Sequence, residues 1–244
     1  MRIPRIYLPQ QLFINQTSEL DERAFQHCIR VLRLKQGAQL ICFNGDGCEY
    51  FASIETINKK SAVININEII ENNTESGLNI HLGLGISKGE RMEFAIQKAV
   101  ELGVDEITPL FTEHCVVNLD EKRSLKRTQH WQGIVISACE QSGRNTIPVL
   151  NNPLTLKQWA GTIESQCLVL DPLADSSMKV IQPENKNMAL VIGPEGGLSS
   201  AEISEINLKP NFHPVKFGPR ILRTETAAVA AITAMQLLWG DLLE

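Results

Sequence analysis

The residues best suited to chemistry lie in a glycine-rich stretch, Ala189–Ile203, which reads ALVIGPEGGLSSAEI. An apolar run typical of a buried strand leads into the loop Gly193–Gly197. Glycines let backbone amides approach a ligand closely, and Ser199 followed by Glu202 is the capping-box start of a helix, whose N-terminus attracts anions. The stretch predicts a ligand-binding loop, although a plain strand-to-helix turn has the same composition.

Two arginines stand in a second segment, FGPRILRTETAA, which covers residues 217–228. Arg220 and Arg223 follow an apolar strand pattern, and Thr224 is a suitable N-cap for the alanine-rich helix that comes next. Guanidinium groups here could stabilise negative charge on a substrate. Isolated arginines are, however, more often solvated surface charges. This segment alone therefore does not establish a binding site, and the other segments must be considered with it.

A third segment, Leu168-Val169-Leu170-Asp171-Pro172, is an apolar run that ends in a polar turn. It belongs to a region after residue 72 in which apolar runs alternate with helical patterns, which predicts a mostly parallel sheet covered on both faces. We expect strands at 78–86, 105–112, 167–172, 188–194 and 213–217, and helices at 89–104, 122–141, 155–163, from 199 and at 224–239. If the strands are parallel, all three loops open at the carboxyl edge of the sheet, where open α/β sheets bind ligands.

The region before residue 72 has a different character. Short β-rich runs at 38–44, 49–58 and 61–70 surround a turn at Asn44–Gly47, and a short helix at about 21–32 precedes them. The polar stretch 71–77 is typical of a linker. The sequence therefore predicts a small β-rich domain over 1–72 and an α/β domain over 73–244.

Composition limits the class of protein. Of the 244 residues 43% are apolar and 21% are charged, as in globular proteins, and no apolar run approaches the ~18 residues of a membrane span. The six cysteines and five histidines lack metal-site spacing, which indicates reduced thiols and no metal. We therefore expect a soluble cytoplasmic protein. Gly83 and Gly85 are followed by Gly89, which breaks the dinucleotide-binding pattern and disfavours a dehydrogenase.

Charge permits an RNA partner without showing one. The net charge of −5 argues weakly against nucleic acid, but residues 1–35 hold a local basic excess. Proteins bind phosphates with patches and not with their average charge.

Together these motifs resemble the SPOUT methyltransferases, whose C-terminal part forms a trefoil knot, and within them the RsmE family. The likeness rests on GPEGG after a buried strand and on FGPRILRTETAAVAA about twenty residues later, with Phe217 where the family usually has leucine. The stretches RIPRIYL, HCIRVLRLKQGAQLICFNGDG, KGERMEFAIQKAVELGVDEITPLFTEHCVV and ACEQSGRNTIP also look like that family. The resemblance therefore covers nearly the whole chain.

The resemblance implies a fold and an activity. The fold would be a SPOUT domain with a knotted C-terminal part, preceded by a small PUA-like β-barrel that binds RNA. The activity would be transfer of the methyl group of S-adenosylmethionine (SAM) to N3 of one uridine in 16S (small-subunit) ribosomal RNA, within the small ribosomal subunit. Such enzymes act as homodimers, and the small-residue stretch Ala227–Ala231 would suit that interface. The alternatives are a SPOUT enzyme acting on transfer RNA or another ribosomal position, and a non-catalytic RNA-binding or ribosome-assembly protein.

The resemblance also implies a set of site residues. Those expected to hold the cofactor are Leu170, Asp171, Gly193, Glu195, Gly197, Phe217, Gly218, Ile221, Leu222, Arg223 and Thr226. Uracil N3 carries a weakly acidic proton, so a cation on the O2 or O4 carbonyl and a proton acceptor would both help. We assign these roles to Arg223 and Glu225, while Glu195 is expected to anchor its loop. The basic residues expected to contact RNA are Arg2, Arg5, Arg30, Arg33, Lys88, Arg91 and Arg144.

Overall fold

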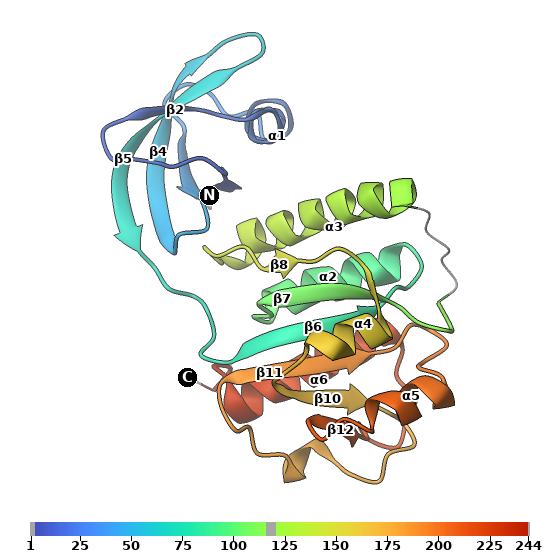
Figure 1. The fold of residues 1–244 in the computed structure, drawn as a ribbon. Coiled ribbons are helices and arrows are strands. Elements are labelled where there is room, and N and C mark those ends of the chain that lie inside the picture. The colour runs from blue at the N-terminus through green and yellow to red at the C-terminus, as the bar shows by residue number, and fades with distance from the viewer. Residues whose placement is uncertain (1–2, 116–120, 244) are drawn as a thin grey trace. The chain divides into compact units, whose positions relative to one another are not determined.

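The structure is a computed structural model that describes residues 3–115 and 121–243 of the chain. The chain forms two compact units, one of residues Met1–Glu75 with Cys139–Ile147 and one of Ser76–Ala138 with Pro148–Glu244 (Figure 1). The domain limits 1–72 and 73–244 stay a prediction. Each unit is described by itself below.

The first unit is built on a five-stranded sheet in the order β1-β3-β4-β5-β2. Its strands are β1 (Arg5–Tyr7), β2 (Thr17–Glu19), β3 (Gln39–Phe43), β4 (Cys48–Ile57) and β5 (Ala62–Glu71). Alternate residues of β4 and β5, among them Ile54 and Ile64, enter the core, as expected for a half-buried sheet. The three longer strands confirm the sequence prediction, whereas the three-residue strands β1 and β2 were missed.

The predicted helix at 21–32 divides into two parts. Asp21 caps α1 (Glu22–Phe25) by accepting a hydrogen bond from the Ala24 N–H at 2.7 Å. The chain then widens into a π-helical turn, Gln26–Val31, and Arg33, two residues beyond it, has a φ of 54°. Such turns are rare and are frequent at functional sites.

The second unit contains a mostly parallel sheet in the order β12-β10-β11-β6-β7-β8, with β9 paired to β7, which confirms the predicted α/β class. Its strands are β6 (Asn79–Gly85), β7 (Glu106–Phe111), β8 (Val149–Leu150), β9 (Leu154–Thr155), β10 (Gln166–Leu170), β11 (Asn187–Ile192) and β12 (Phe212–Val215). The helices are α2 (Glu90–Glu101), α3 (Glu121–Ser142), α4 (Leu156–Thr162), α5 (Ser200–Ile206) and α6 (Thr224–Trp239), with a 3₁₀ turn at Met178–Val180. The last residues of α3 belong to the first unit.

The helices cover both faces of this sheet. Helices α4 and α5 lie on one face, and α2 and α6 pack against each other on the opposite face (Figure 1). The core beneath α4 is centred on the fully buried Trp159, which packs with Leu110, Val169 and Phe212. Apolar strands covered on both faces read as continuous apolar runs, which is why the sequence located them.

Trp159 also explains a glycine that had suggested a different ligand. A Cβ on Gly83 would lie 2.8 Å from the Trp159 ring, so glycine is required there for packing. The threading of the C-terminal part through a knot stays a prediction. Within the described ranges, no helix has both the length and the apolar content needed to cross a membrane.

Candidate active site

The three loops singled out by the sequence meet at one edge of the sheet. Strand β10 pairs in parallel with β11 on one side and with β12 on the other. The segments that follow Leu170, Ile192 and Val215 therefore start next to one another at the carboxyl edge (Figure 1). This confirms the predicted convergence. Below they are named the Asp171 loop (171–177), the glycine loop (193–198) and the arginine loop (216–223).

The glycine loop is folded tightly on itself. The Gly197 N–H donates to the Pro194 carbonyl at 2.8 Å, and Gly197 has a φ of 71°. A Cβ on Gly193 would lie 2.7 Å from the Gly197 carbonyl carbon, and a Cβ on Gly85 would lie 2.4 Å from the Pro194 nitrogen. Any side chain at these positions would push backbone apart. The glycines therefore let the loop backbone pack against itself and against β6, and only Gly197 has open space where a Cβ would be.

The helix after the glycine loop begins as predicted. Ser199 caps α5 by accepting a hydrogen bond from the Glu202 N–H, and the Glu202 carboxylate accepts one from the Ser199 N–H in return. This capping box fixes the direction in which the chain leaves the loop.

Glu195 fastens the glycine loop to the start of α2. Its Oε1 accepts hydrogen bonds from the Lys88 N–H at 3.1 Å and from the Arg91 guanidinium at 3.2 Å. Burial acts to raise the pKa of Glu195, but these bonds outweigh burial and hold its pKa below the ordinary glutamate value. An ionised, engaged carboxylate is a weak proton acceptor. The geometry therefore favours an anchoring role over a catalytic one.

The Asp171 loop and the arginine loop are joined to each other. The buried Asp171 donates its N–H to the Val215 carbonyl at 3.1 Å, and its Oδ1 accepts from the Leu173 N–H at 2.8 Å. Further along, the Lys216 N–H donates to the Ser176 carbonyl at 2.8 Å. The carboxylate of Asp171 thus shapes its own turn, and a direct contact with a cofactor stays a prediction.

The arginine loop exposes groups that a ligand would cover. Gly218 has a φ of 74°, the Ile221 side chain is 87% exposed, and Arg223 and Thr226 are exposed as well. Phe217 and Leu222 are half-buried. Among the described residues, the Arg223 guanidinium forms no hydrogen bond or ion pair. The loop therefore offers one cation and apolar surface at the carboxyl edge.

The start of α6 differs from the prediction by one residue. Arg223, with an extended backbone, occupies the N-cap position without a side-chain hydrogen bond, while Thr224 is buried in the first turn. Thr224 as N-cap was therefore wrong. Glu225 follows, and its Oε2 is buried without a hydrogen-bond partner in the part of the chain that the structure describes. A buried acceptor of this kind is unusual unless a ligand supplies the donor.

Two of the expected RNA-binding arginines are structural instead. Arg5 is 9% exposed, forms an ion pair with Glu49 and donates to the Asn145 side chain at 2.6 Å. Arg144 is 4% exposed and forms a bidentate pair with Glu75. Both guanidinium groups are already engaged inside the first unit, which disfavours the expected phosphate contacts of Arg5 and Arg144.

The other basic candidates have different surroundings. Arg30 is exposed and donates to the Lys59 carbonyl at 2.9 Å, and Arg33 is exposed too. Lys88 and Arg91 are exposed beside the glycine loop. Arg2 lies outside the described residues.

The alanines of α6 also lie elsewhere than expected. Ala227, Ala228 and Ala231 are buried within the unit itself, where α6 packs against α2. Their small size serves the packing of two helices inside one chain. Burial of these three alanines within the unit disfavours them as interface residues, and a homodimer stays a prediction.

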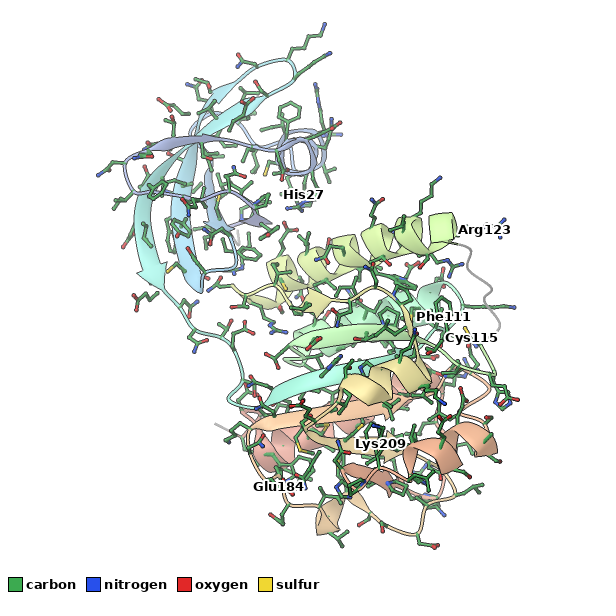
Figure 2. The ribbon with its side chains drawn as sticks, viewed as in Figure 1. His27, Phe111, Cys115, Arg123, Glu184 and Lys209 are labelled. Atoms are coloured by element: carbon green, nitrogen blue, oxygen red, sulfur yellow. The ribbon has the colours of Figure 1, made fainter. Side chains whose placement is uncertain are left out.

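Sequence reasoning missed one segment at this edge, which follows β7 and contains His114 and Cys115. Strand β7 ends at Phe111, and Cys115 lies four residues beyond it (Figure 2). The His114 Nδ1 lies 2.9 Å from the Gly196 carbonyl of the glycine loop. The position of this segment after a predicted parallel strand was the signal that could have identified it.

Comparison with known proteins agrees with the geometry. Residues 74–236 match the model of an RNA methyltransferase domain, and residues 20–67 match that of an RNA methyltransferase PUA domain. The chain is 44% identical to the ribosomal RNA small subunit methyltransferase E of Buchnera aphidicola subsp. Schizaphis graminum, over 99% of this chain and 98% of that protein. The chain therefore belongs to the family of ribosomal RNA small subunit methyltransferases E.

Two solved structures resemble the whole chain. A methyltransferase of Legionella pneumophila in complex with bound SAM has a TM-score of 0.95 at 45% identity, covering 99% of this chain and 100% of that one. A ribosomal RNA small subunit methyltransferase E of Neisseria gonorrhoeae bound to SAM has a TM-score of 0.90 at 38% identity, with coverage of 99% and 100%. These similarities extend over both units.

Proposed function

We propose that this protein transfers the methyl group of SAM to N3 of one uridine in 16S ribosomal RNA of the small subunit, giving 3-methyluridine. It would act in the cytoplasm as a homodimer. The observation that carries the proposal is the convergence of the Asp171, glycine and arginine loops at one sheet edge, in a chain of this family. SAM-bound neighbours of the same length support the choice of cofactor.

The residues present at the edge fit SAM. The space where a Cβ of Gly197 would be is open, so a ligand could approach bare backbone there, as the adenosine part would need. Half-buried Phe217 and Leu222 provide apolar contact. The unpartnered Oε2 of Glu225 is an acceptor that a donor on the cofactor or on the substrate would satisfy. The loop residues named in the sequence analysis would hold the cofactor through these groups.

When bound, SAM supplies a methyl carbon already activated by its sulfonium. The protein must then align the two reactants, and positioning alone can supply about 7–11 kcal/mol of the barrier. For this alignment, the Asp171 loop is tied to the arginine loop through Asp171 and Lys216, and the glycine loop is tied to the start of α2 through Glu195.

The acceptor needs help to lose its proton. The exposed guanidinium of Arg223 would donate to a uracil carbonyl and stabilise the negative charge that develops on the base. The free carboxylate oxygen of Glu225 would take the proton from N3. Glu195 is not suited to this role because its carboxylate is already engaged by Lys88 and Arg91.

Uracil N3 takes part in base pairing, so the target base must be unpaired or turned out of its stack. Recognition then depends on shape and on phosphate contacts. Arg30 and Arg33 of the first unit, and Lys88 and Arg91 of the second, are the exposed cations that support this part of the proposal.

The test is transfer of labelled methyl from SAM to small ribosomal subunits isolated from cells that lack the enzyme, followed by digestion and identification of the modified nucleoside. A single 3-methyluridine in 16S RNA is the expected result. Methylation of transfer RNA or of another ribosomal position would show that the proposed substrate is wrong. SAM binding without transfer to subunits, free ribosomal RNA or transfer RNA would favour a non-catalytic RNA-binding or ribosome-assembly protein.

A further inference from the structure

A fourth segment belongs to the edge that carries the three loops. Residues 112–115, named here the His114 segment, follow β7. Strand β7 pairs in parallel with β6, and β6 pairs in parallel with β11, whose end leads into the glycine loop. Parallel pairing places the ends of these strands at the same edge. The His114 segment is therefore a neighbour of the glycine loop although about eighty residues separate them in sequence.

Three hydrogen bonds hold the His114 segment to different parts of the edge. The Glu113 N–H donates to the Glu202 carboxylate in the first turn of α5 at 2.9 Å. The Cys115 thiol donates to the Ile86 carbonyl just after β6 at 3.2 Å. Between them, the His114 Nδ1 lies 2.9 Å from the Gly196 carbonyl. The backbone on either side is thus fixed, and the imidazole is held against the glycine loop.

Gly196 is shaped for this contact. A Cβ added at Gly196 would lie 2.8 Å from the His114 Cβ and 3.3 Å from its Cγ. The close atom is at the root of the histidine side chain, so it cannot move away without moving the segment. The glycine therefore permits the imidazole to lie against the loop backbone, and the two residues form one unit.

We propose that His114 is a positioning residue for the cofactor, which holds the glycine loop in the conformation that binds SAM. This inference rests on the proposed function. A carbonyl oxygen can only accept, so the Nδ1 must carry the hydrogen. The bond holds the carbonyl of the Gly196–Gly197 peptide, and the N–H of the same peptide donates to the Pro194 carbonyl. A loop held in its bound shape before the ligand arrives binds more tightly.

The first test measures the equilibrium binding of SAM alone by calorimetry. His114→Ala should raise the Kd by about 3- to 10-fold, the worth of one hydrogen bond. His114→Asn should restore most of the affinity, because its side-chain amide nitrogen occupies the position of Nδ1 and also donates. His114→Gln should not, because its amide lies one bond further out. His130→Ala, an exposed histidine of α3 paired with Glu93, is the matched control and should bind as the wild type does.

Kinetics and stability separate positioning from folding. His114→Ala should raise the KM for SAM by a similar factor and leave kcat at saturating SAM and RNA within about 2-fold. Its thermal unfolding should match that of the wild type. Unchanged SAM affinity in His114→Ala would overturn the inference. Equal weakening in the alanine and asparagine variants would also overturn it, because the hydrogen bond would then not be the cause.

A double-mutant cycle tests the pairing with Gly196. Gly196→Ala should weaken SAM binding by displacing His114, and adding His114→Ala should cost little more, because the two changes break the same contact. Gly133→Ala on α3, where a Cβ meets nothing within 4 Å, is the control and should have no effect. Fully additive losses would contradict the pairing. If the wild type itself binds no SAM, the proposed function fails first, and this inference fails with it.

Discussion

In the first unit Arg5 and Arg144 are buried in ion pairs with Glu49 and Glu75, whereas in the second unit Arg220 and Arg223 stand exposed on the arginine loop. The residue type is the same and the surroundings are opposite. Arg5 also donates to the Gly143 carbonyl at 3.0 Å, just past the end of α3, where a cation suits the helix dipole. Basic residues in a sequence therefore divide into structural and functional groups by the acceptors that the fold brings to them.

The largest expected effect is the loss of the Arg5 guanidinium. Arg5→Ala leaves the Glu49 carboxylate nearly buried without its partner, so the free energy of unfolding should fall by about 3–5 kcal/mol. Denaturant unfolding measures this change. Arg30→Ala, an exposed arginine of the same unit, should change it by less than about 0.5 kcal/mol. If the two variants are equally stable, the division between the two groups of arginines is wrong.

The second effect concerns rate and not stability. Arg223→Ala should lower kcat by roughly 10²–10³-fold with SAM and RNA saturating, because the charge developing on the uracil carbonyl loses its donor. The variant should unfold at the wild-type temperature, since the side chain is exposed. Arg220→Ala is the matched variant in the same loop and should have a much smaller effect. Wild-type turnover by Arg223→Ala would remove this residue from the mechanism.

A third, smaller effect should appear in RNA affinity. Replacing Arg30 and Arg33 together by glutamate should weaken binding to small-subunit RNA by roughly tenfold and make its salt dependence shallower, because fewer counterions are released. Lys157→Glu, a charge change at an exposed residue of α4, is the control. An unchanged affinity and salt slope would place the RNA away from this surface.

The smallest effect is expected at the ion pair of Arg91 and Glu195. This pair is partly exposed, unlike the buried Arg5 and the exposed Arg223. The folded-state pKa of Glu195 is lowered, so its stabilising contribution is present above the unfolded pKa and is lost as pH falls through the folded pKa. Glu195→Gln should therefore be less stable than the wild type near pH 7 by less than about 1 kcal/mol. The difference should shrink as pH falls below about 4. If the stability difference between Glu195→Gln and the wild type grows in acid, the lowered pKa of Glu195 is wrong.

Much of the second unit could be predicted from sequence because its strands are covered on both faces. Short apolar-rich runs between helical patterns located β6, β7, β10, β11 and β12, and parallel pairing then brought the three loops together. The two-residue strands β8 and β9 were missed, since so short a strand depends on the tertiary contacts of its neighbours. The same holds for β1 and β2 in the first unit.

The site residues were harder to predict than the elements. Nothing near Arg5 in the sequence indicates that residues 143–145 return to cover it, and the same long-range packing buries Arg144. His114 was not singled out from the sequence because its partner is the backbone carbonyl of Gly196, far along the chain. The convergence of the three loops could be predicted because it follows from parallel strands. The contacts of Arg5 and His114 could not, because they depend on how distant segments pack.

The measurement that tests the account most directly is amide hydrogen exchange of the wild-type protein with and without SAM. We expect the cofactor to slow exchange in residues 171–177, 193–198 and 216–226, with a smaller effect at 112–115. A hollow at the opposite end of the same sheet, lined by Asn79, Glu106 and Glu164, should show no change. Protection confined to that hollow, or absent from all three loops, would contradict the assignment of the carboxyl edge as the cofactor site.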